Sequence, residues 1–454
     1  MRSSLAPMER RLAVVGGGVA GLAAARAAEL EAGRLDMPLT VTLLEAGPRL
    51  GGKVLTEDVD GVPLEWGPDS FLVSRPGAIE LARALGLGDE LVAPGTGRAH
   101  LLLGGRLRPI PSGTVMGVPA GPGSLLAAVR SGVLGLGGAA RALLEPALPG
   151  RPDPGASAGD VACARLGRQV ADRLVGPLLG GVYGAPAGEL GLDAIPQLAN
   201  GRSLMLAARR ARRAGRAEFR TIRGGMSRLV EGLREQVRGE VRTGTAVVGL
   251  GPDGDAFRIA TTAGEEPADA VILAAPAGAA AIILSGVAPG AAGPLGEVEY
   301  RGSVVVHLRW AEGALGRPMD AAGYLVVGGG TVAACSWLNA KWPHLRLREP
   351  RARAIVVDPA AMAAPDDEVC ARVAEEVGAV LGVTEDAVDV RLRRWGEAMP
   401  VFAPGHRARV AAAREALPPG VVLAGAAYDG IGLPDCIRSG EDAARSIAGF
   451  LGEA

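Results

Sequence analysis

Cysteine is scarce in this chain of 454 residues, and its distribution excludes two kinds of scaffold. The four cysteines stand singly, with no CxxC pair and no regular spacing, at Cys163, Cys335, Cys370 and Cys436. A disulfide framework or a zinc site would need grouped cysteines, so neither is predicted. We therefore expect a reducing, cytoplasmic location.

Histidine is equally rare, and the four histidines form no HxxxH or HExxH pattern. A protein-bound metal is therefore not predicted. Lysine is rarer still, because Lys53 and Lys341 are the only two and arginine carries almost all the positive charge. The formal net charge of -1 supplies no global field for nucleic acid, so no nucleic-acid partner is expected and recognition must be local.

Long uninterrupted apolar runs are also missing. The two longest uncharged runs, residues 109–129 and 270–296, are each broken by several prolines and glycines. A membrane-spanning helix needs about 20 consecutive apolar residues, so no transmembrane segment is expected. The N-terminus lacks a signal core, so export is not expected either. Peripheral contact with a membrane surface stays open.

The apolar pattern that is present outlines a mixed α/β fold in two or three domains. Residues 12–15 and 41–45 have strand patterns around an alanine-rich helix at 19–32, which makes a βαβ unit. Apolar residues at helical spacing over 124–213, broken by a loop at 149–159, predict a helical domain. Further strands are predicted at 101–110 as a hairpin, 241–250, 257–262, 270–273, 303–310, 324–337, 388–395 and 421–424, with helices at 77–91, 366–381 and 435–451.

The turn between the first strand and the first helix carries a GxGxxG motif. Gly16 suits the tight turn, Gly18 allows a pyrophosphate to approach the backbone, and Gly21 allows the helix to pack closely on the strand. Glu45, at the end of the second strand, can accept hydrogen bonds from ribose hydroxyls and would repel a 2′-phosphate, which disfavours NADP. A permanently held flavin, an exchanging nicotinamide and a plain turn are the three interpretations at this point.

A second glycine motif, GxGxxA at residues 328–333, lacks the helix and the acidic residue that surround the first one. The sequence after it alternates and ends in Trp, Asn and Pro instead of forming a helix, and no strand ending in an acid follows. We interpret it as a hairpin turn. The chain is therefore expected to lack its own NAD(P)H site.

The C-terminal segment GAAYDGIGLPDCIRSG runs from a strand through glycines into a helix. Free backbone N–H groups and the positive end of a helix dipole would meet there, which suits the negative charge of a reduced flavin. A capped terminal helix is the alternative. Asp435 would then be an early-turn carboxylate, and Cys436 is interpreted as a small buried residue and not as a nucleophile.

The continuation after Glu45, AGPRLGGKVLT, resembles that of the FAD-dependent amine oxidase and phytoene desaturase superfamily. Seven further segments, in order from end to end, resemble the porphyrinogen oxidases of haem biosynthesis: LEWGPDSFLVSRP (64–76), PSGTVMGVP (111–119), GPLLGGVYGAPAGELGLDA (176–194), FRTIRGGMSRLVEGL (219–233), KWPH (341–344), RWGEAMPVFAPGH (394–406) and YDGIGLPDCI (428–437). GPDSF and GTVMGVP are most similar to the Gram-positive branch, which acts on coproporphyrinogen III.

The resemblance implies an α/β protein, α+β overall. It divides the chain into a Rossmann-like FAD-binding domain (8–74, 219–290 and 394–454), a mixed-sheet substrate domain (75–112 and 291–393) and a helical domain (113–218). It also implies these FAD contacts: Gly16, Gly17, Gly18, Val19, Ala20, Gly21, Glu45, Ala46, Gly52, Lys53, Gly67, Pro68, Asp69, Ser70, Val247, Trp395, Ile431, Gly432 and Leu433. Taken alone, Val247 would be an ordinary strand residue, Trp395 a core aromatic and Lys53 a solvated loop charge.

One position departs from the family pattern. The mitochondrial and plastid branch often has an arginine where this chain has Asp69. An arginine could pair with a substrate propionate, whereas Asp69 would repel it, so that contact is not carried over. The resemblance leaves open which of the many arginines hold propionates, and no catalytic side chain is predicted.

The implied activity is FAD-dependent oxidation of coproporphyrinogen III to coproporphyrin III, with dioxygen as acceptor and hydrogen peroxide released. The alternatives are a protoporphyrinogen IX oxidase, an amine or carotenoid oxidoreductase on the same scaffold, and a non-catalytic flavin- or porphyrin-binding partner. Transient contact with the next enzyme of the haem pathway is a further expectation.

Overall fold

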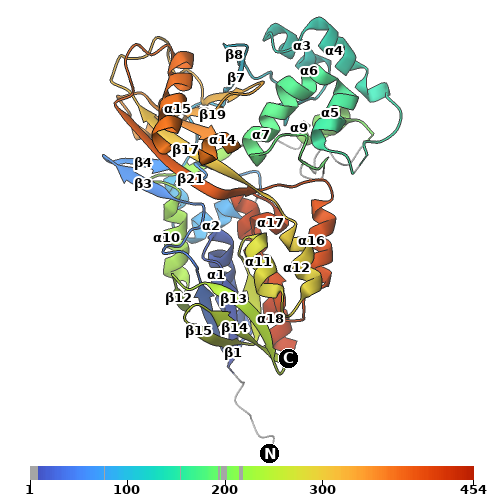
Figure 1. The fold of residues 1–454 in the computed structure, drawn as a ribbon, viewed down its shortest axis with the longest axis vertical. Helices are drawn as coiled ribbons and strands as arrows, with labels where there is room; N and C mark the ends of the chain where they lie inside the picture. The colour runs from blue at the N-terminus through green and yellow to red at the C-terminus, as the bar shows by residue number, and fades with distance from the viewer. Residues whose placement is uncertain are drawn as a thin grey trace, which may run out of the picture. The chain divides into compact units, whose positions relative to one another are not determined.

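The computed structural model describes residues 9–75, 77–153, 155–192, 195, 202–213 and 218–453. Figure 1 shows the chain coloured from its N-terminus to its C-terminus. It forms two compact units, one made of residues 1–92, 218–299 and 407–454 and the other of residues 93–217 and 300–406. The three-domain division expected from the sequence stays a prediction.

The first unit is built on a five-stranded parallel sheet. Its strand order is β12 (Glu240–Arg242), β2 (Leu39–Leu44), β1 (Arg10–Val15), β16 (Ala270–Leu273) and β22 (Val421–Leu423). The central strands are runs of small and branched apolar residues, as expected for strands covered on both faces. The mixed α/β class and the first βαβ unit are confirmed.

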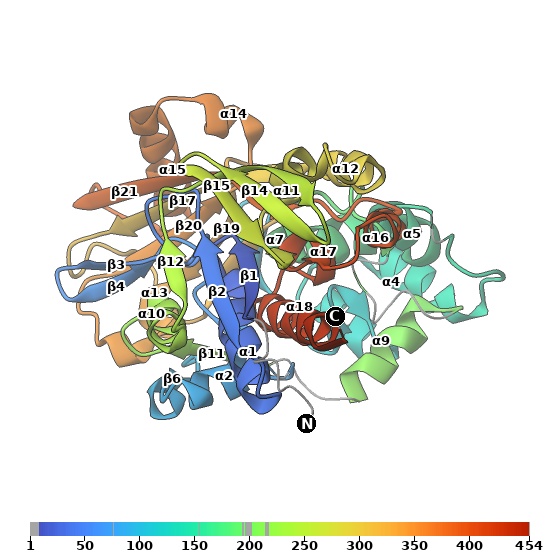
Figure 2. The same cartoon turned by 90° about the horizontal axis from the view of Figure 1, so that it is seen from below.

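Helices cover one face of this sheet, and a three-stranded antiparallel meander covers the other. Figure 2 shows α1 (Val19–Arg34) and α18 (Leu433–Glu453) on one side of β1 and β2, with β14 (Ala256–Thr261) and β15 (Gly264–Ala268) on the opposite side. The other strands of this unit are β3 (Thr56–Val59), β4 (Val62–Glu65), β5 (Phe71–Leu72), β6 (Leu91–Val92), β11 (Phe219–Ile222) and β13 (Val247–Asp253). Its other α-helices are α2 (Ala78–Ala84), α10 (Ser227–Gln236), α11 (Ala277–Leu284), α12 (Pro289–Gly296), α16 (His406–Glu415) and α17 (Ala426–Asp429).

The predicted strand at 241–250 is wrong as a single element. The chain forms β12 in the parallel sheet, turns, and begins β13 of the meander at Val247. The turn is possible because Gly244 adopts a φ of 67°, and its N–H donates to the carbonyl oxygen of Gly47 at 2.8 Å. The predicted helix at 77–91 is also shorter than expected, because Gly86 leaves α2 at a φ of 77°.

The second unit contains a seven-stranded sheet in which every pair is antiparallel except β18 with β7. The strand order is β21 (Asp389–Pro400), β17 (Tyr300–Arg309), β20 (Arg351–Val356), β19 (Val332–Trp337), β18 (Gly323–Val326), β7 (His100–Leu103) and β8 (Arg106–Pro109). Residues 327–331 connect β18 to the antiparallel β19, so the interpretation of the motif at 328–333 as a hairpin turn is confirmed.

Helices complete the second unit. One group packs around its own apolar core: α3 (Pro122–Arg130), α4 (Leu136–Leu143), α5 (Ala158–Leu166), α6 (Arg168–Val170), a π-helical turn at Ala171–Val175, α7 (Gly176–Tyr183) and α9 (Leu204–Arg213). The others are α13 (Leu338–Lys341), α14 (Pro359–Ala363) and α15 (Asp366–Leu381), and a short hairpin of β9 (Thr114–Val115) with β10 (Val118–Pro119) also belongs to this unit.

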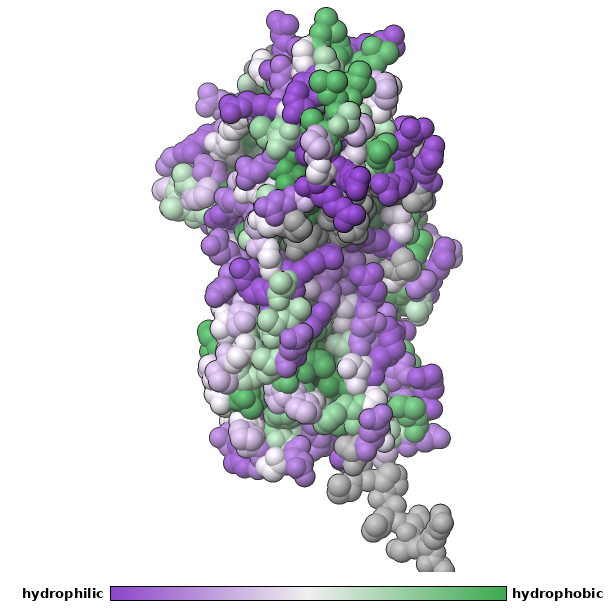
Figure 3. All heavy atoms as spheres, turned by 90° about the vertical axis from the view of Figure 1, so that its right-hand side faces the viewer, coloured by the Kyte–Doolittle hydropathy of each residue, from purple (hydrophilic) through white to green (hydrophobic). Residues whose placement is uncertain are grey.

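On the face shown in Figure 3, hydrophilic residues predominate. Among the described helices, none has the length and apolar character needed to cross a bilayer.

Candidate dinucleotide-binding site

The glycine motif lies at the carboxyl edge of the parallel sheet, where ligands of such sheets bind. β1 ends at Val15, and the N–H of Gly16 then donates to the carbonyl oxygen of Leu44 at the end of β2, at 2.8 Å. Gly16 has a φ of 108°, and a Cβ on it would lie 2.6 Å from the carbonyl oxygen of Ala274. This position therefore accepts only glycine.

The next two glycines have different surroundings. A Cβ on Gly17 would lie 2.6 Å from the side chain of Leu50, whereas a Cβ on Gly18 would meet no protein atom within 4 Å. Gly18 is the N-cap of α1 with an extended conformation, and the first-turn N–H groups of a helix have no acceptor within the helix. The open side of Gly18 thus fits a pyrophosphate bound at the positive end of α1.

The third glycine of the motif, Gly21, allows α1 to pack on the loop that precedes it. A Cβ there would lie 1.9 Å from the carbonyl oxygen of Gly16. Val19 and Ala20, between the glycines, are buried in the first turn of α1.

The Glu45 carboxylate is held beside the glycine loop by two backbone groups. Its Oε2 accepts from the N–H of Gly17 at 2.6 Å, and its Oε1 accepts from the N–H of Gly47 at 2.7 Å, on the far side of Ala46. Charge-assisted bonds of this kind fix the carboxylate at the end of β2. The predicted acid and the predicted glycines are therefore brought together.

The RLGGK segment passes directly along the glycine loop. The N–H of Gly51 donates to the carbonyl oxygen of Gly17 at 2.8 Å, and a Cβ on Gly52 would lie 3.3 Å from the Cα of Gly18. Arg49 secures this loop by donating to the carbonyl oxygens of Leu50 at 3.0 Å and of Gly52 at 2.5 Å. Gly51 was not among the predicted contacts, although it bonds directly to Gly17.

The turn at residues 67–70 lies against the same segment. A Cβ on Gly67 would lie 1.7 Å from the carbonyl oxygen of Lys53, so only glycine fits there. Pro68, Asp69 and Ser70 follow it and are half-buried, and the Ser70 hydroxyl donates to Asp69 Oδ1 at 3.0 Å. Lys53 and this turn are therefore neighbours.

The C-terminal motif meets the N-terminal motif through α18. This helix packs along α1 so closely that a Cβ on Gly440 would lie 2.1 Å from the carbonyl oxygen of Ala20. The turn at Ile431 and Gly432 leads into α18, which begins at Leu433. The helices that follow the two motifs thus lie side by side within the first unit.

Asp435 is a buried carboxylate in the first turn of α18. Its side chain is 4% exposed and forms ion pairs with Arg75 and, at 3.0 Å, with Arg438. Its Oδ2 lies 3.1 Å from the positions that a Cβ on Gly430 or Gly432 would occupy. The sequence indicated the carboxylate but not Arg75, because 360 residues separate the two.

Cys436 follows it with different chemistry. Burial raises the pKa of the Cys436 thiol to about 12. A protonated thiol is a poor nucleophile, in agreement with its interpretation as a small buried residue.

Val247 and Trp395 lie in different units. The segment before Val247 runs beside the end of β2, because the N–H of Thr245 donates to the carbonyl oxygen of Glu45 at 2.9 Å. Trp395 is on β21 of the second unit, where the Arg393 guanidinium lies 5.5 Å from its ring centroid. Its role as a flavin contact stays a prediction.

A second set of contacts, which the sequence did not indicate, links the RLGGK loop to α10. The Glu65 carboxylate accepts from the N–H of Met226 at 2.6 Å and from the Thr56 hydroxyl at 3.0 Å, which anchors the first turn of α10. From that helix, Val230 packs within 3.1 Å of the position that a Cβ on Gly51 would occupy.

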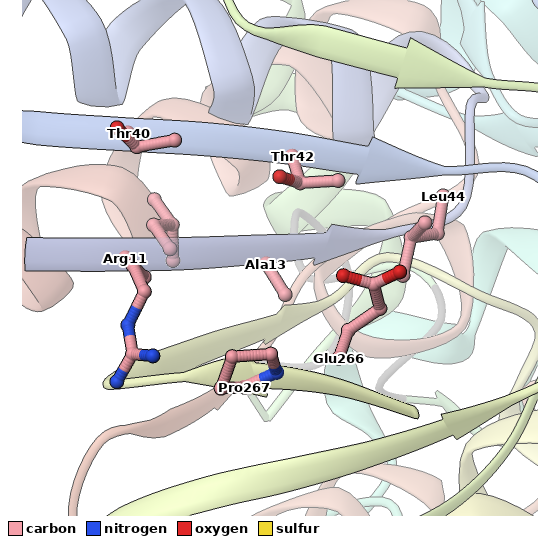
Figure 4. Close-up of a pocket in the computed structure, with 8 residues that line it drawn as sticks. Arg11, Ala13, Thr40, Thr42, Leu44, Glu266 and Pro267 are labelled. Carbon is pink, nitrogen blue, oxygen red and sulfur yellow. The ribbon is translucent and has the colours of Figure 1, made fainter. Parts of the chain in front are cut away.

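The pocket in Figure 4 is separate from the glycine loop. It has a volume of about 130 Å³ and is lined on the meander side of the sheet by Thr40, Thr42, Ala13, Arg11 and Glu266, among others. These strand residues alternate with the ones that pack under α1, such as Val41 and Leu43. The pocket therefore lies on the other face of the sheet from α1.

Comparisons with known proteins agree over nearly the whole chain. Residues 19–448 match the family model described as flavin containing amine oxidoreductase. The coproporphyrinogen III oxidase of Bacillus subtilis is 33% identical, over 98% of this chain and 99% of the relative. The coproporphyrinogen III oxidase of Mycobacterium tuberculosis is 35% identical, over 96% of this chain and 97% of the relative. A crystal structure from Exiguobacterium sp. 255-15, assigned as a protoporphyrinogen oxidase, aligns with a TM-score of 0.84 and 30% identity over 97% of this chain and 99% of that one.

Proposed function

Because this chain belongs to the flavin-containing amine oxidoreductase family and, within it, to the porphyrinogen oxidases, we propose that it oxidises coproporphyrinogen III to coproporphyrin III. The chain is an FAD-dependent oxidoreductase. One observation supports the substrate. The coproporphyrinogen III oxidases of Bacillus subtilis and Mycobacterium tuberculosis align with this chain over nearly their whole length.

The residues around the glycine loop fit FAD. We propose that the pyrophosphate lies over Gly18 and the first turn of α1, with Glu45 and Ala46 beside the ribose and Val247 against the adenine. Gly52 and Lys53 would cover the pyrophosphate, the turn at residues 67–70 would border the cofactor, and the turn from Ile431 to Leu433 would present backbone N–H groups to it. Trp395 completes the proposed set.

When bound, FAD supplies the two-electron oxidation chemistry, taking hydride equivalents from the porphyrinogen. The chain's own part is to bind and orient: the first-turn N–H groups of α1 hold negative charge, and Gly17 and Gly47 keep the Glu45 carboxylate in place. Three rounds remove six hydrogens from the macrocycle. The proposed electron acceptor is dioxygen, which would be reduced to hydrogen peroxide.

Protoporphyrinogen IX is the second candidate substrate, because the aligned Exiguobacterium structure carries that assignment. The two porphyrinogens differ in their number of carboxylates, four in coproporphyrinogen III and two in protoporphyrinogen IX. Asp69 offers no positive charge where an arginine stands in the mitochondrial and plastid branch. A cytoplasmic location and transient contact with the next haem-pathway enzyme belong to the same proposal.

The test is anaerobic reduction of the purified holoprotein, followed by air. Coproporphyrinogen III should bleach the flavin absorbance, and air should restore it with porphyrin fluorescence, oxygen uptake and hydrogen peroxide. Protoporphyrinogen IX and a primary amine are added in parallel, and protein-free porphyrinogen in air corrects for autoxidation. Faster bleaching by protoporphyrinogen IX would replace the proposed substrate, and an unchanged spectrum with both porphyrinogens would reject porphyrinogen oxidation.

A further inference from the structure

The seven-stranded sheet of the second unit has two chemically different faces. Val304, Val306 and Leu308 of β17 point into an apolar core that also contains Val369 and Val373 of α15. His307 and Arg309 alternate with them along the strand and therefore point to the other face. The helices thus cover the face of even-numbered β17 residues, and the odd-numbered ones form a face that carries charge.

Strand register gathers five arginines and a histidine on that second face. His307 stands opposite Arg353 of β20 and opposite Arg391 of β21, while Arg309 stands opposite Arg351. Arg393 follows Arg391 two residues along β21 and is therefore on the same face. We call these six residues the cationic face.

The orientation of β21 is supported by the arginine next to Arg393. Arg394 points toward the helices, since it donates to the carbonyl oxygens of Ala361 at 2.6 Å and Ala364 at 2.7 Å and pairs with Asp366 at 2.8 Å. Arg393 instead lies over the ring of Trp395, its neighbour on the cationic face. An aromatic surface therefore borders the charges.

Carboxylates of neighbouring residues offset part of this charge. Glu349 accepts from Arg309 at 3.0 Å and lies 3.8 Å from Arg351, and Asp389 accepts from Arg391 at 2.9 Å. Like charges on directly paired strands destabilise a sheet, and the cost grows where they are withdrawn from water. His307, Arg351 and Arg353 are each less than 10% exposed.

Arginine is the side chain best suited to carboxylates, because its planar fork donates two parallel hydrogen bonds. Neighbouring strands lie about 4.8 Å apart, so three strands spread these cations over about 10 Å. That spacing allows more than one carboxylate of a single ligand to bind at once.

We propose that the cationic face binds the carboxylates of a polycarboxylate substrate, and that Trp395 offers apolar surface to the body of the same molecule. This inference rests on the proposed function, in which the ligand is a porphyrinogen and the carboxylates are its propionates. The inference names Arg391 and Arg393, two of the partly exposed members, as residues that favour four carboxylates over two. They position the substrate and take no part in bond breaking.

The test measures binding of the product, coproporphyrin III, to the FAD-loaded protein by porphyrin fluorescence. Arg391→Gln and Arg393→Gln should each weaken it about tenfold to a hundredfold, the effect of losing a charge-assisted hydrogen bond. Coproporphyrin III tetramethyl ester has no charges, so it should bind these variants and the parent equally. Protoporphyrin IX should lose less affinity than coproporphyrin III.

Arg372→Gln is the matched control, because Arg372 lies on α15 and pairs with Glu368 on the helical side of the unit. It should leave coproporphyrin III binding unchanged. Arg391→Lys and Arg393→Lys should recover part of the affinity, and flavin content with thermal midpoint reports folding of every variant. Rate constants for anaerobic flavin reduction at saturating porphyrinogen should stay within about twofold of the parent, since uniform binding affects KM alone.

The inference is overturned if both Gln variants bind coproporphyrin III as the parent does, or if the ester loses affinity in parallel. Measuring turnover distinguishes a failure of this inference from a failure of the proposed function. A parent protein that binds coproporphyrin III through these arginines but oxidises no porphyrinogen refutes the function alone. A parent that oxidises coproporphyrinogen III while the variants bind normally refutes the cationic face alone.

Discussion

Gly440 of α18 lies directly on the carbonyl oxygen of Ala20 in α1, with only 2.1 Å between that oxygen and the position of a Cβ. The two residues are 420 positions apart in sequence, yet their contact sets the spacing of the helices that begin at the two cofactor motifs. The absence of a side chain at Gly440 therefore allows α18 to pack closely on α1.

Gly440→Ala should destabilise the first unit by about 3 kcal/mol or more, since the new methyl group must push two backbones apart. Thermal unfolding of the FAD-loaded protein measures it. Gly449→Ala on the same helix is the control, because a Cβ there meets no atom within 4 Å. That variant should gain about 0.5–1 kcal/mol from helix propensity. Equal midpoints for the two variants would contradict the close helix contact.

Gly18→Ala should impair cofactor binding without affecting the fold. Gly18 has a φ of -69° and open space around its Cβ position, so alanine fits the backbone but occupies the side facing the proposed pyrophosphate. We expect the Kd for FAD to rise more than tenfold, about 1.4 kcal/mol, with apoprotein stability unchanged. FAD titration by flavin fluorescence and apoprotein unfolding together check this.

Gly21→Ala should instead destabilise the fold itself. Its Cβ would lie 1.9 Å from the carbonyl oxygen of Gly16, so the variant should unfold at a lower temperature even without FAD. Normal apoprotein stability for this variant would show that α1 does not pack tightly on the glycine loop.

Asp269→Asn should reduce stability at neutral pH but not in acid. Hydrogen bonds from the Arg11 guanidinium hold the pKa of the Asp269 carboxyl below its ordinary 3.8. Because the pKa of Asp269 is lower in the folded state than in the unfolded state, the ion pair contributes its full stability at pH values above the unfolded-state pKa. This contribution is lost as the pH falls through the folded-state pKa. Arg11 is 45% exposed, so water screens the pair and we expect about 1 kcal/mol at pH 7.

Urea unfolding of the parent and Asp269→Asn, from pH 7 to below pH 3.8, measures this difference. The two urea midpoints should converge at the acid end. Asp255→Asn, at an exposed carboxylate of the β13–β14 turn, should match the parent throughout. A gap between parent and Asp269→Asn that widens in acid would contradict the sign of the shift.

The four thiols should divide into two classes in the native protein. Burial raises the pKa of Cys335 and of Cys436 to about 12, whereas Cys163 and Cys370 are half-buried. Alkylation near about pH 8 acts on thiolates, so Cys335 and Cys436 should stay unmodified until the chain unfolds. Mass spectrometry after a pulse of iodoacetamide, with and without guanidinium, locates the labels. Rapid native labelling of Cys436 would show that the start of α18 is open to solvent.

Short-range features could be predicted from the sequence because their physics is local. Gly16 and Gly18 follow a strand and precede a helix, and Gly21 lies in the first turn of that helix, so backbone sterics alone indicate the turn and its ligand class. Glu45 lies one residue beyond β2, where parallel strands end side by side, and its approach to Gly17 follows from that geometry. The hairpin at 328–333 was recognisable for the same reason, since no helix-forming pattern follows it.

Long-range features depended on how distant segments pack. The pattern at 241–250 is compatible with one strand, whereas the structure divides it between two sheets at a turn where the N–H of Gly244 donates to the carbonyl oxygen of Gly47. Arg75 meets Asp435, and Arg353 and Arg391 flank His307, through pairings between segments that no local periodicity encodes. Local sterics specify which turns and strands form, whereas strand register and helix packing specify which charges become neighbours, because those contacts form only when the whole core closes.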